Sequence, residues 1–230
     1  MEQNHTGILY AVSVGPGDPE LLTLQAVRTL ERCTVIAAPQ TASGRTLALD
    51  IVRAAMDLQG KTILPLAFSM SPDAATREAH WRAAADAVET VLATGEDVAL
   101  VNLGDVSLYA TAYYILDLVR ADGYAAVMLP GVMSISAVAA RLTRSLTRME
   151  QPLHVLPGST DLTDALRLPG TKVLMKSGRA IHEAVDAIER AGLLDRAALV
   201  ADCGLPTEQV YEDLRQLPEQ LSYFATILVY

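Results

Sequence analysis

The sequence is short of cysteine, histidine and basic residues. Its 230 residues include two cysteines and four histidines, and 18 Lys and Arg stand against 27 Asp and Glu. Cys33 and Cys203 occur in unrelated contexts and the histidines lack ligand spacing, so we expect neither a disulfide framework nor a metal site. The net charge of −9 argues against a nucleic-acid partner, because phosphate binding needs a cationic face. The one local basic segment, residues 141–148, is predicted to be a solvated helix face or the lining of a pocket for an acidic small molecule.

Targeting and membrane segments are also lacking. The opening "MEQNHTGILY" has neither the basic nor the apolar region of a signal peptide. The longest uncharged run lies between Asp122 and Arg141, and because Pro130 and Gly131 interrupt it, it predicts strand, turn and helix rather than a membrane span. We therefore expect a cytoplasmic protein without a membrane partner. Hydrophobic residues make up 51% of the chain and charged residues 20%, which supports a buried core.

Apolar runs alternate with helical patterns over the first half of the chain. Strands are predicted at 8–14, 34–39, 61–68, 97–104 and 124–131, and helices at 24–31, 45–56, 77–93 and 112–120. These strands are continuously hydrophobic, as expected for strands covered on both faces, and the alternation predicts a parallel sheet with right-handed crossovers. After Pro130 the pattern changes to helices at 134–142 and 180–191 and strands at 152–158, 171–178, 197–204 and 222–230. We therefore predict two domains, residues 1–130 and 131–230.

The loop "GPGDPE" at residues 15–20 suggests a phosphate site but fails both tests for one. Glu20 stands where a dinucleotide fingerprint has its third glycine, and no Gly-Lys-Ser/Thr follows as in a Walker loop. Pro16 and Pro19 also remove backbone donors that a phosphate cradle needs. Asp18 and Thr23 are predicted helix caps. A rigid turn that starts a helix therefore explains this loop as well as a ligand site does.

Two further loops favour a ligand site. "VNLGDVSLYATAYYIL" follows the fourth predicted strand, and "LPGVMSISA" follows the fifth. In open parallel sheets ligands collect at the carboxyl ends of the strands. Three unusual loops are thus expected at one edge of the sheet.

The motifs resemble those of a known family. "VGPGDPELLT", "NLGDVSLYAT", "PGVMSISA" and "VLMKSGR" resemble, in order and spacing, the signature segments of the tetrapyrrole methylases, which are S-adenosylmethionine-dependent enzymes of cobalamin and siroheme synthesis. "LPLAFSMSPDAATREAHW" and "YFATILV" are similar to segments of the precorrin-2 C20-methyltransferase subfamily. Ser69 and Val106 depart from the usual pattern, because prolines are typical there, and Ser71 is often threonine in relatives.

The resemblance implies an architecture and a cofactor. It implies two α/β domains, the first with a mainly parallel five-stranded sheet and the second with a mixed sheet, with a deep cleft between them and usually in a homodimer. S-adenosyl-L-methionine would lie at the domain junction and leave as S-adenosyl-L-homocysteine. The implied cofactor-binding residues are Pro16, Leu103, Gly104, Asp105, Leu108, Thr111, Ser134, Lys176, Ser177 and Gly204.

The implied reaction is C-methylation of precorrin-2, or of cobalt-factor II, at C20, to give precorrin-3A or cobalt-factor III. The electron-rich meso carbon attacks the donor methyl directly, so no protein nucleophile is needed. Asp105 and Tyr109 are candidates for a weak general base, and each could instead hydrogen-bond the cofactor. Arg77, Arg141 and Arg144 are candidates for binding the substrate carboxylates.

The alternatives are a methylase acting at another ring position or ring state, an RNA- or protein-modifying methylase of the same fold, and a non-catalytic nucleotide-binding module. No residue decides between metal-free and cobalt-containing substrate.

Overall fold

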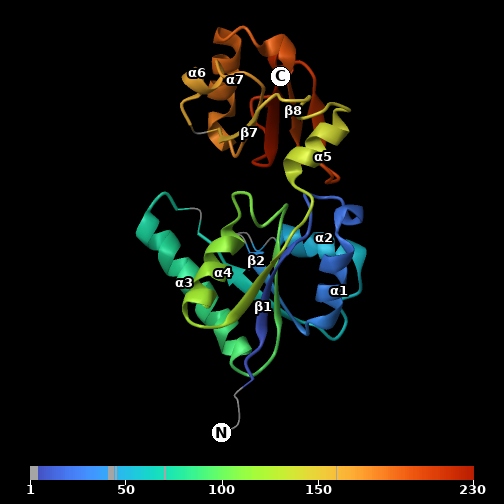
Figure 1. Ribbon diagram of the computed structural model, residues 1–230, viewed down its shortest axis with the longest axis vertical. Helices are drawn as coiled ribbons and strands as arrows, with labels where there is room; N and C mark the ends of the chain where they lie inside the picture. The colour runs from blue at the N-terminus through green and yellow to red at the C-terminus, as the bar shows by residue number, and fades with distance from the viewer. Residues whose placement is uncertain (1–4, 41–43, 45, 70, 159) are drawn as a thin grey trace. The chain divides into compact units, whose positions relative to one another are not determined.

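The computed structural model describes residues 5–40, 44, 46–69, 71–158 and 160–230 (Figure 1). The chain divides into two compact units, Met1–Met133 and Ser134–Tyr230. Each unit has its own five-stranded sheet and its own helices. The predicted two-domain α/β fold is therefore confirmed.

The first unit is built on a fully parallel sheet with the strand order β3-β2-β4-β1-β5. Its strands are β1 (Ile8–Ser13), β2 (Val35–Gln40), β3 (Thr62–Ala67), β4 (Val98–Asn102) and β5 (Ala125–Leu129). Its helices are α1 (Leu24–Arg32), α2 (Leu47–Ala55), α3 (Ala74–Leu92) and α4 (Thr111–Ala121), with the short 3₁₀ helix η1 (Pro19–Leu21) before α1. All five strands and four helices were predicted to within a few residues. Arg45, in the predicted second helix, lies outside the described residues.

The helices cover the two faces of this sheet in pairs. Side chains of α1 and α2 pack with one set of strand residues, which includes Val12, and side chains of α3 and α4 pack with the alternate set, which includes Ala11 (Figure 1). Successive residues of a central strand point to opposite faces, and both faces are covered by helices. The central strands therefore do not alternate between apolar and polar residues.

Capping side chains set where the helices begin. Asp18 accepts a hydrogen bond from the Glu20 amide at the start of η1, and Thr23 accepts one from the Ala26 amide at the start of α1, so both predicted caps are confirmed. The α3 helix begins three residues earlier than predicted, because Asp73 accepts a hydrogen bond from the Thr76 amide (2.8 Å) and caps it.

The second unit has a mixed sheet with the strand order β6-β7-β10-β8-β9, in which only β6 and β7 are parallel. Its strands are β6 (Leu153–Pro157), β7 (Thr171–Met175), β8 (Ala197–Ala201), β9 (Gln209–Tyr211) and β10 (Ala225–Val229). Its helices are α5 (Ser134–Arg141), α6 (Leu162–Ala165) and α7 (Ile181–Arg190), with the 3₁₀ helices η2 (Gly178–Ala180), η3 (Leu194–Arg196) and η4 (Leu214–Gln216). The α6 and α7 helices share a core with β7, β8 and β10, and α5 packs against β10. The sequence analysis missed β9 and α6, which are only three and four residues long.

The basic segment 141–148 is not a helix beyond its first residue, so that part of the prediction is wrong. Thr143 adopts a left-handed conformation (φ 53°). Its amide donates to the Ala140 carbonyl and the Arg144 amide donates to the Ala139 carbonyl, which ends α5 in a Schellman arrangement. A β-branched residue is rare in this conformation, which is why the sequence did not indicate the stop.

Neither thiol has an accessible, reactive setting. Cys33 and Cys203 are free and buried, and burial raises the pKa of each to about 11. No helix in the described part of the chain combines the length and the apolar character needed to cross a membrane.

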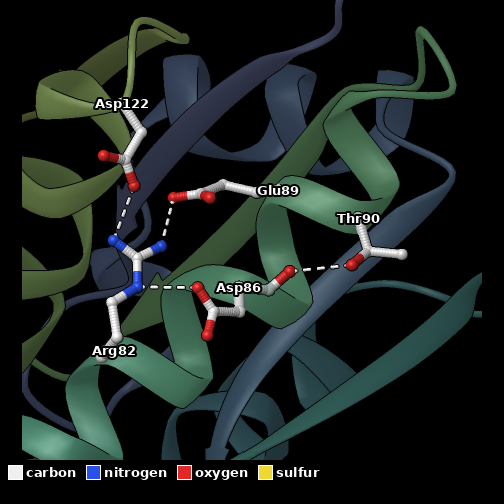
Figure 2. A network of polar contacts seen from close by, with 5 residues as sticks. All are labelled: Arg82, Asp86, Glu89, Thr90 and Asp122. Atoms are coloured by element: carbon white, nitrogen blue, oxygen red, sulfur yellow. Dashed lines mark hydrogen bonds and ion pairs between the residues drawn. The ribbon is translucent and has the colours of Figure 1, made fainter.

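One arginine joins α3 to the turn after α4. Figure 2 shows the Arg82 guanidinium between three carboxylates. Its Nε lies 2.7 Å from Asp86, and its two Nη atoms lie 2.6 Å from Glu89 and 2.6 Å from Asp122. Asp122 directly follows α4, so the cluster fixes the position of one helix on the other. Without the guanidinium, three negative charges would face one another.

We expect Arg82→Met to lower the free energy of unfolding of the first unit by about 1–2 kcal/mol, because charged hydrogen bonds are lost and the carboxylates repel. Urea unfolding followed by Trp81 fluorescence measures this, since Trp81 is the single tryptophan and stacks on Tyr114 of α4 at 4.1 Å. Arg53→Met, which removes an exposed pair with Asp50, is the control and should cost less than about 0.5 kcal/mol. Equal effects of the two substitutions would contradict a stabilising role for the cluster.

Candidate functional site

The strand order places a topological switch point between β1 and β4. These strands are neighbours, but β1 continues into α1 on one face of the sheet and β4 continues into α4 on the other. The two connections therefore diverge to opposite faces beyond the carboxyl ends of β1 and β4, which is the arrangement at which open parallel sheets bind ligands. Both glycine loops of the sequence analysis begin at this point.

Two glycines join the loops directly. The Gly104 amide donates to the Gly15 carbonyl (2.7 Å), which forms an isolated antiparallel bridge. Both residues have left-handed backbones, with φ of 77° for Gly15 and 74° for Gly104. A side chain on Gly15 would press on Leu21, whereas a Cβ on Gly104 would meet no atom within 4 Å. The space directly beside the Gly104 Cα is thus open among the described residues.

Asp105 holds the β4 loop to the β5 loop. One carboxylate oxygen accepts a hydrogen bond from the Gly131 amide (2.7 Å), and the other accepts from the amide (2.8 Å) and the hydroxyl of Ser107. Burial by itself would raise the pKa of Asp105, which is 6% exposed, but these hydrogen bonds outweigh it and the pKa is lowered. The carboxylate therefore stays ionised and acts as an acceptor for its own loops.

Ser13 completes the connection from β1. Its buried hydroxyl donates to the Leu129 carbonyl (2.7 Å) and accepts from the Val106 amide (3.0 Å). Gly131 packs so closely on it that a Cβ at position 131 would lie 2.4 Å from the Ser13 Cβ. The ends of β1, β4 and β5 are thus tied together. The sequence analysis missed Ser13, although a hydroxyl at the end of an otherwise apolar strand was the available signal.

The structure brings six predicted cofactor residues of the first unit to this edge. Pro16, Gly104 and Asp105 are buried, Leu103 and Leu108 are half-buried, and Thr111 is the first residue of α4. Tyr109 precedes α4 with φ of 51° and is 39% exposed. Left-handed backbone at a residue other than glycine is costly and concentrates at functional sites.

The remaining predicted cofactor residues lie in the second unit. Ser134 is the first residue of α5. Lys176 directly follows β7 with φ of 54°, and burial lowers the pKa of its ammonium. Ser177 is buried, and its Oγ has no hydrogen-bond partner. Gly204 lies beyond β8 with φ of 81°, after Asp202, which is also left-handed (φ 52°). The carboxyl ends of β7 and β8 thus carry strained backbone and an unpaired hydroxyl at one edge of this sheet.

The three predicted substrate arginines have different settings. Arg77 donates to the carbonyls of Ser71 (2.9 Å) and Pro72 (2.7 Å), which precede its own helix. Arg141 pairs with Glu208, which also accepts from the Gly204 amide (2.9 Å).

Arg144 is set apart from the residues that follow β7 and β8. Its guanidinium lies over the Tyr230 ring at 5.4 Å. Tyr230 follows β10, which runs antiparallel to β7, so Arg144 lies at the opposite edge of the sheet from Lys176 and Ser177.

The described residues contain no group of three or more His, Cys, Asp or Glu side chains that could hold a metal ion. The predicted cofactor residues instead offer one ionised carboxylate and backbone groups in the first unit, and hydroxyls, a lysine and backbone groups in the second.

We expect Asp105→Asn to destabilise the first unit by about 1–3 kcal/mol at pH 7, because the amide accepts fewer and weaker hydrogen bonds. The folded pKa lies below the unfolded value, so this contribution is complete above about pH 4 and is lost as the pH falls through the folded value. Urea unfolding at pH 7 and at low pH, read by Trp81 fluorescence, should show the gap to the wild type shrinking in acid. The exposed Asp117→Asn on α4 is the control, and a gap independent of pH would contradict this account of Asp105.

Known proteins resemble this chain over nearly its whole length. The family model described as Tetrapyrrole (Corrin/Porphyrin) Methylases matches residues 8–218. A cobalt-precorrin-2 C(20)-methyltransferase of Salmonella typhimurium is 34% identical over 97% of this chain and 96% of its own length. A precorrin-2 C(20)-methyltransferase of a Sinorhizobium species is 27% identical over 97% of this chain and 95% of its own.

A solved structure shares the fold. The uroporphyrin-III C-methyl transferase of Thermus thermophilus, complexed with S-adenyl homocysteine, superposes with a TM-score of 0.69 at 20% identity and covers 97% of each chain. The resemblance that the glycine loops indicated therefore extends over nearly the whole sequence, because the family model matches residues 8–218. With its loops at a switch point and a family match from the first strand to residue 218, this chain belongs to the tetrapyrrole methylase family.

Proposed function

We propose that this protein transfers the methyl group of S-adenosyl-L-methionine to C20 of precorrin-2, or of its cobalt form, in cobalamin biosynthesis. The observation that carries the proposal is the 34% identity to a cobalt-precorrin-2 C(20)-methyltransferase over 97% of the chain. The product would be precorrin-3A or cobalt-factor III. The relatives include proteins named for the metal-free and for the cobalt substrate, so the route remains for the experiment below to decide.

The residues at the switch point fit a sulfonium cofactor better than a phosphate ligand. Pro16 and Pro19 supply no amide hydrogens, and the Gly104 amide is already bonded to Gly15. Gly104 has no side chain and a Cβ there would meet no atom within 4 Å, which allows a ligand to approach its backbone closely. The neighbouring Asp105 keeps a negative charge close by, and this favours a cation over an anion.

The second unit offers groups suited to the neutral parts of the cofactor. The unpaired Ser177 Oγ can donate to a ring nitrogen or accept from an amine, and the left-handed turns at Lys176 and Gly204 present backbone groups. We propose these residues, like those of the switch-point loops, as cofactor-binding residues.

The bound cofactor supplies an already activated methyl group, so the chain has to position the reactants and exclude water. C20 of the substrate would provide the electron pair for the new bond, S-adenosyl-L-homocysteine would leave with the pair of the broken bond, and C20 would then lose its proton. The protein needs no nucleophile for these steps. Accordingly, both thiols are buried with raised pKa values.

Tyr109 is the better placed of the two candidate bases. Asp105 spends its carboxylate on Ser107 and Gly131, and the lowered pKa makes it a poor proton acceptor, so we assign it to positioning. Tyr109 is 39% exposed and has a strained backbone conformation in the segment between Gly104 and α4. We propose that it contacts the substrate and assists the loss of the C20 proton.

Cationic side chains are needed for the carboxylates of the substrate. Arg141 is suited to this through its link to Gly204, because a substrate carboxylate could replace Glu208. Arg77 would have to give up its hydrogen bonds to the Ser71 and Pro72 carbonyls before it could bind a carboxylate. Arg144 lies over the Tyr230 ring, away from Lys176 and Ser177, and this position does not support a role in substrate binding.

We further propose a cytoplasmic homodimer. The edge strand β5 supports the dimer, because Val127 and Met128 are 42% and 43% exposed on a strand that pairs only with β1 among the described residues. A second copy would cover this apolar edge.

The experiment that tests the function is an incubation with isotopically labelled S-adenosyl-L-methionine and precorrin-2, with and without cobalt. Mass spectrometry and NMR should show one labelled methyl group at C20. Methylation at another position would replace the assignment by another member of the family. No methylation of either substrate, with S-adenosyl-L-homocysteine still bound, would refute it.

We expect Gly104→Ala to weaken S-adenosyl-L-homocysteine binding roughly tenfold, or ~1.4 kcal/mol, because the methyl group enters the space assigned to the cofactor. Gly123→Ala is the matched control, since its φ is 90° and its Cβ would also meet no atom within 4 Å. Both substitutions should cost about 1–2 kcal/mol of stability through backbone strain, but only the first should change binding. Isothermal calorimetry and urea unfolding measure the two effects. Unchanged affinity in Gly104→Ala would move the cofactor away from this loop.

A further inference from the structure

The exposed aromatic side chains of the first unit gather at the start of α4. Among the described residues of this unit they are Tyr109, Tyr113 and Tyr114, which are 39%, 45% and 47% exposed. Aromatic residues make up only 5% of the chain, so three exposed ones within residues 109–114 form a patch rather than a scatter. Contiguous exposed apolar surface, unlike single exposed residues, indicates a binding site.

Tyr113 lies outside the core of the first unit. The residues of α4 that are buried in this core are Ala112, Ile115, Leu116 and Val119. Among the described residues that pack against the same core from its margin, Tyr113 does not occur. The stability of the fold therefore does not explain an aromatic ring at this position.

Two neighbouring rings support Tyr113. Trp81 of the adjacent helix α3 packs against the core, and Tyr114 stacks on it with ring centroids 4.1 Å apart and ring planes within 4° (Figure 1). Tyr113 meets Tyr114 edge to face, with centroids 6.4 Å apart and planes at 71°. Edge-to-face contact is a favourable geometry for aromatic rings. The Tyr113 ring is thus held from one side, while 45% of the residue stays exposed.

The amino end of α4 connects this ring with the methylation site and supplies positive charge. The helix begins at Thr111, a predicted cofactor residue, shortly after Tyr109, to which we assign the loss of the C20 proton. Ala110 at the N-cap makes no side-chain hydrogen bond to the helix, and the first turn contains no acidic residue. The partial positive charge of the helix terminus therefore lies uncompensated beside Tyr113. An aromatic face next to positive charge matches a ligand that combines a conjugated ring system with carboxylates.

We propose that Tyr113 is a substrate-binding residue, whose ring packs against the tetrapyrrole while a substrate carboxylate lies at the amino end of α4. Trp81 and Tyr114 act through Tyr113 and are positioning residues. This inference rests on the proposed function, because the tetrapyrrole is the occupant. It assigns recognition of the ring system to α4, whereas the arginine candidates address only the carboxylates.

Steady-state methylation of precorrin-2 by the full chain is the first test. Tyr113→Leu should raise KM for precorrin-2 roughly tenfold and change kcat less than about twofold, because a contact made equally to substrate and transition state is lost. Tyr113→Phe keeps the ring and should retain the wild-type KM. The affinity for S-adenosyl-L-homocysteine, measured by calorimetry, should be the same in all variants. Leu24→Ala is the control, since Leu24 is the first residue of α1, on the other face of the sheet, and is 73% exposed.

A binding measurement without turnover separates this inference from the proposed function. Precorrin-2 should quench the fluorescence of Trp81, the single tryptophan, and Tyr113→Leu should raise the midpoint of that titration by the same factor as KM. This shift without methylation at C20 would support the site and refute the proposed function. Methylation at C20 with KM unchanged in Tyr113→Leu would overturn the site alone. A dimer that becomes a monomer in Tyr113→Leu, with KM unchanged, would assign the surface to a second copy of the chain and also overturn it.

Discussion

The first unit depends on the hydrogen bonds that Asp105 and Ser13 make at the carboxyl ends of three parallel strands. Parallel pairing aligns β1, β4 and β5, but it does not fix the loops that follow, and at a switch point these loops diverge to opposite faces. The Asp105 carboxylate reaches Gly131 across 26 residues, and the Ser13 hydroxyl reaches both Leu129 and Val106. The bridge between Gly15 and Gly104 then closes the first loop on the second. These ties fix the three loops relative to one another, which a binding site built from loop backbone would require.

The sequence predicted most of the fold, because covered strands leave long apolar runs and helices leave caps. Asp18 and Thr23 cap helices as expected. The order of the strands was not predictable in this way, since the insertion of β4 between β1 and β2 is decided by packing between residues far apart in the chain. The end of α5 was also missed, because Thr143 adopts a conformation that its type disfavours. The β9 strand was missed because its three residues are too few to show an alternation of apolar and polar side chains.

The position of the site was more predictable than the roles of its residues. Strand ends give a location, since carboxyl ends of parallel strands share one edge, and six predicted residues of the first unit lie there. Roles depend on partners that sequence does not reveal. Asp105 is a plausible base until the three donors on its carboxylate are known. Arg77 and Arg141 are equally plausible substrate ligands until the carbonyls and the carboxylate that they contact are seen.

Asp105 is a buried charge near the end of a strand, and its hydrogen-bond partners show whether it is explained by structure or by binding. Asp105 is satisfied by three donors of its own chain, so its charge is fully used in holding loops together. A buried charge that the fold satisfies can be explained by stability alone, whereas one that the fold leaves unsatisfied needs a group from outside the chain. The same reasoning applies to the Ser177 hydroxyl, which is buried and unpaired where the cofactor is proposed to bind.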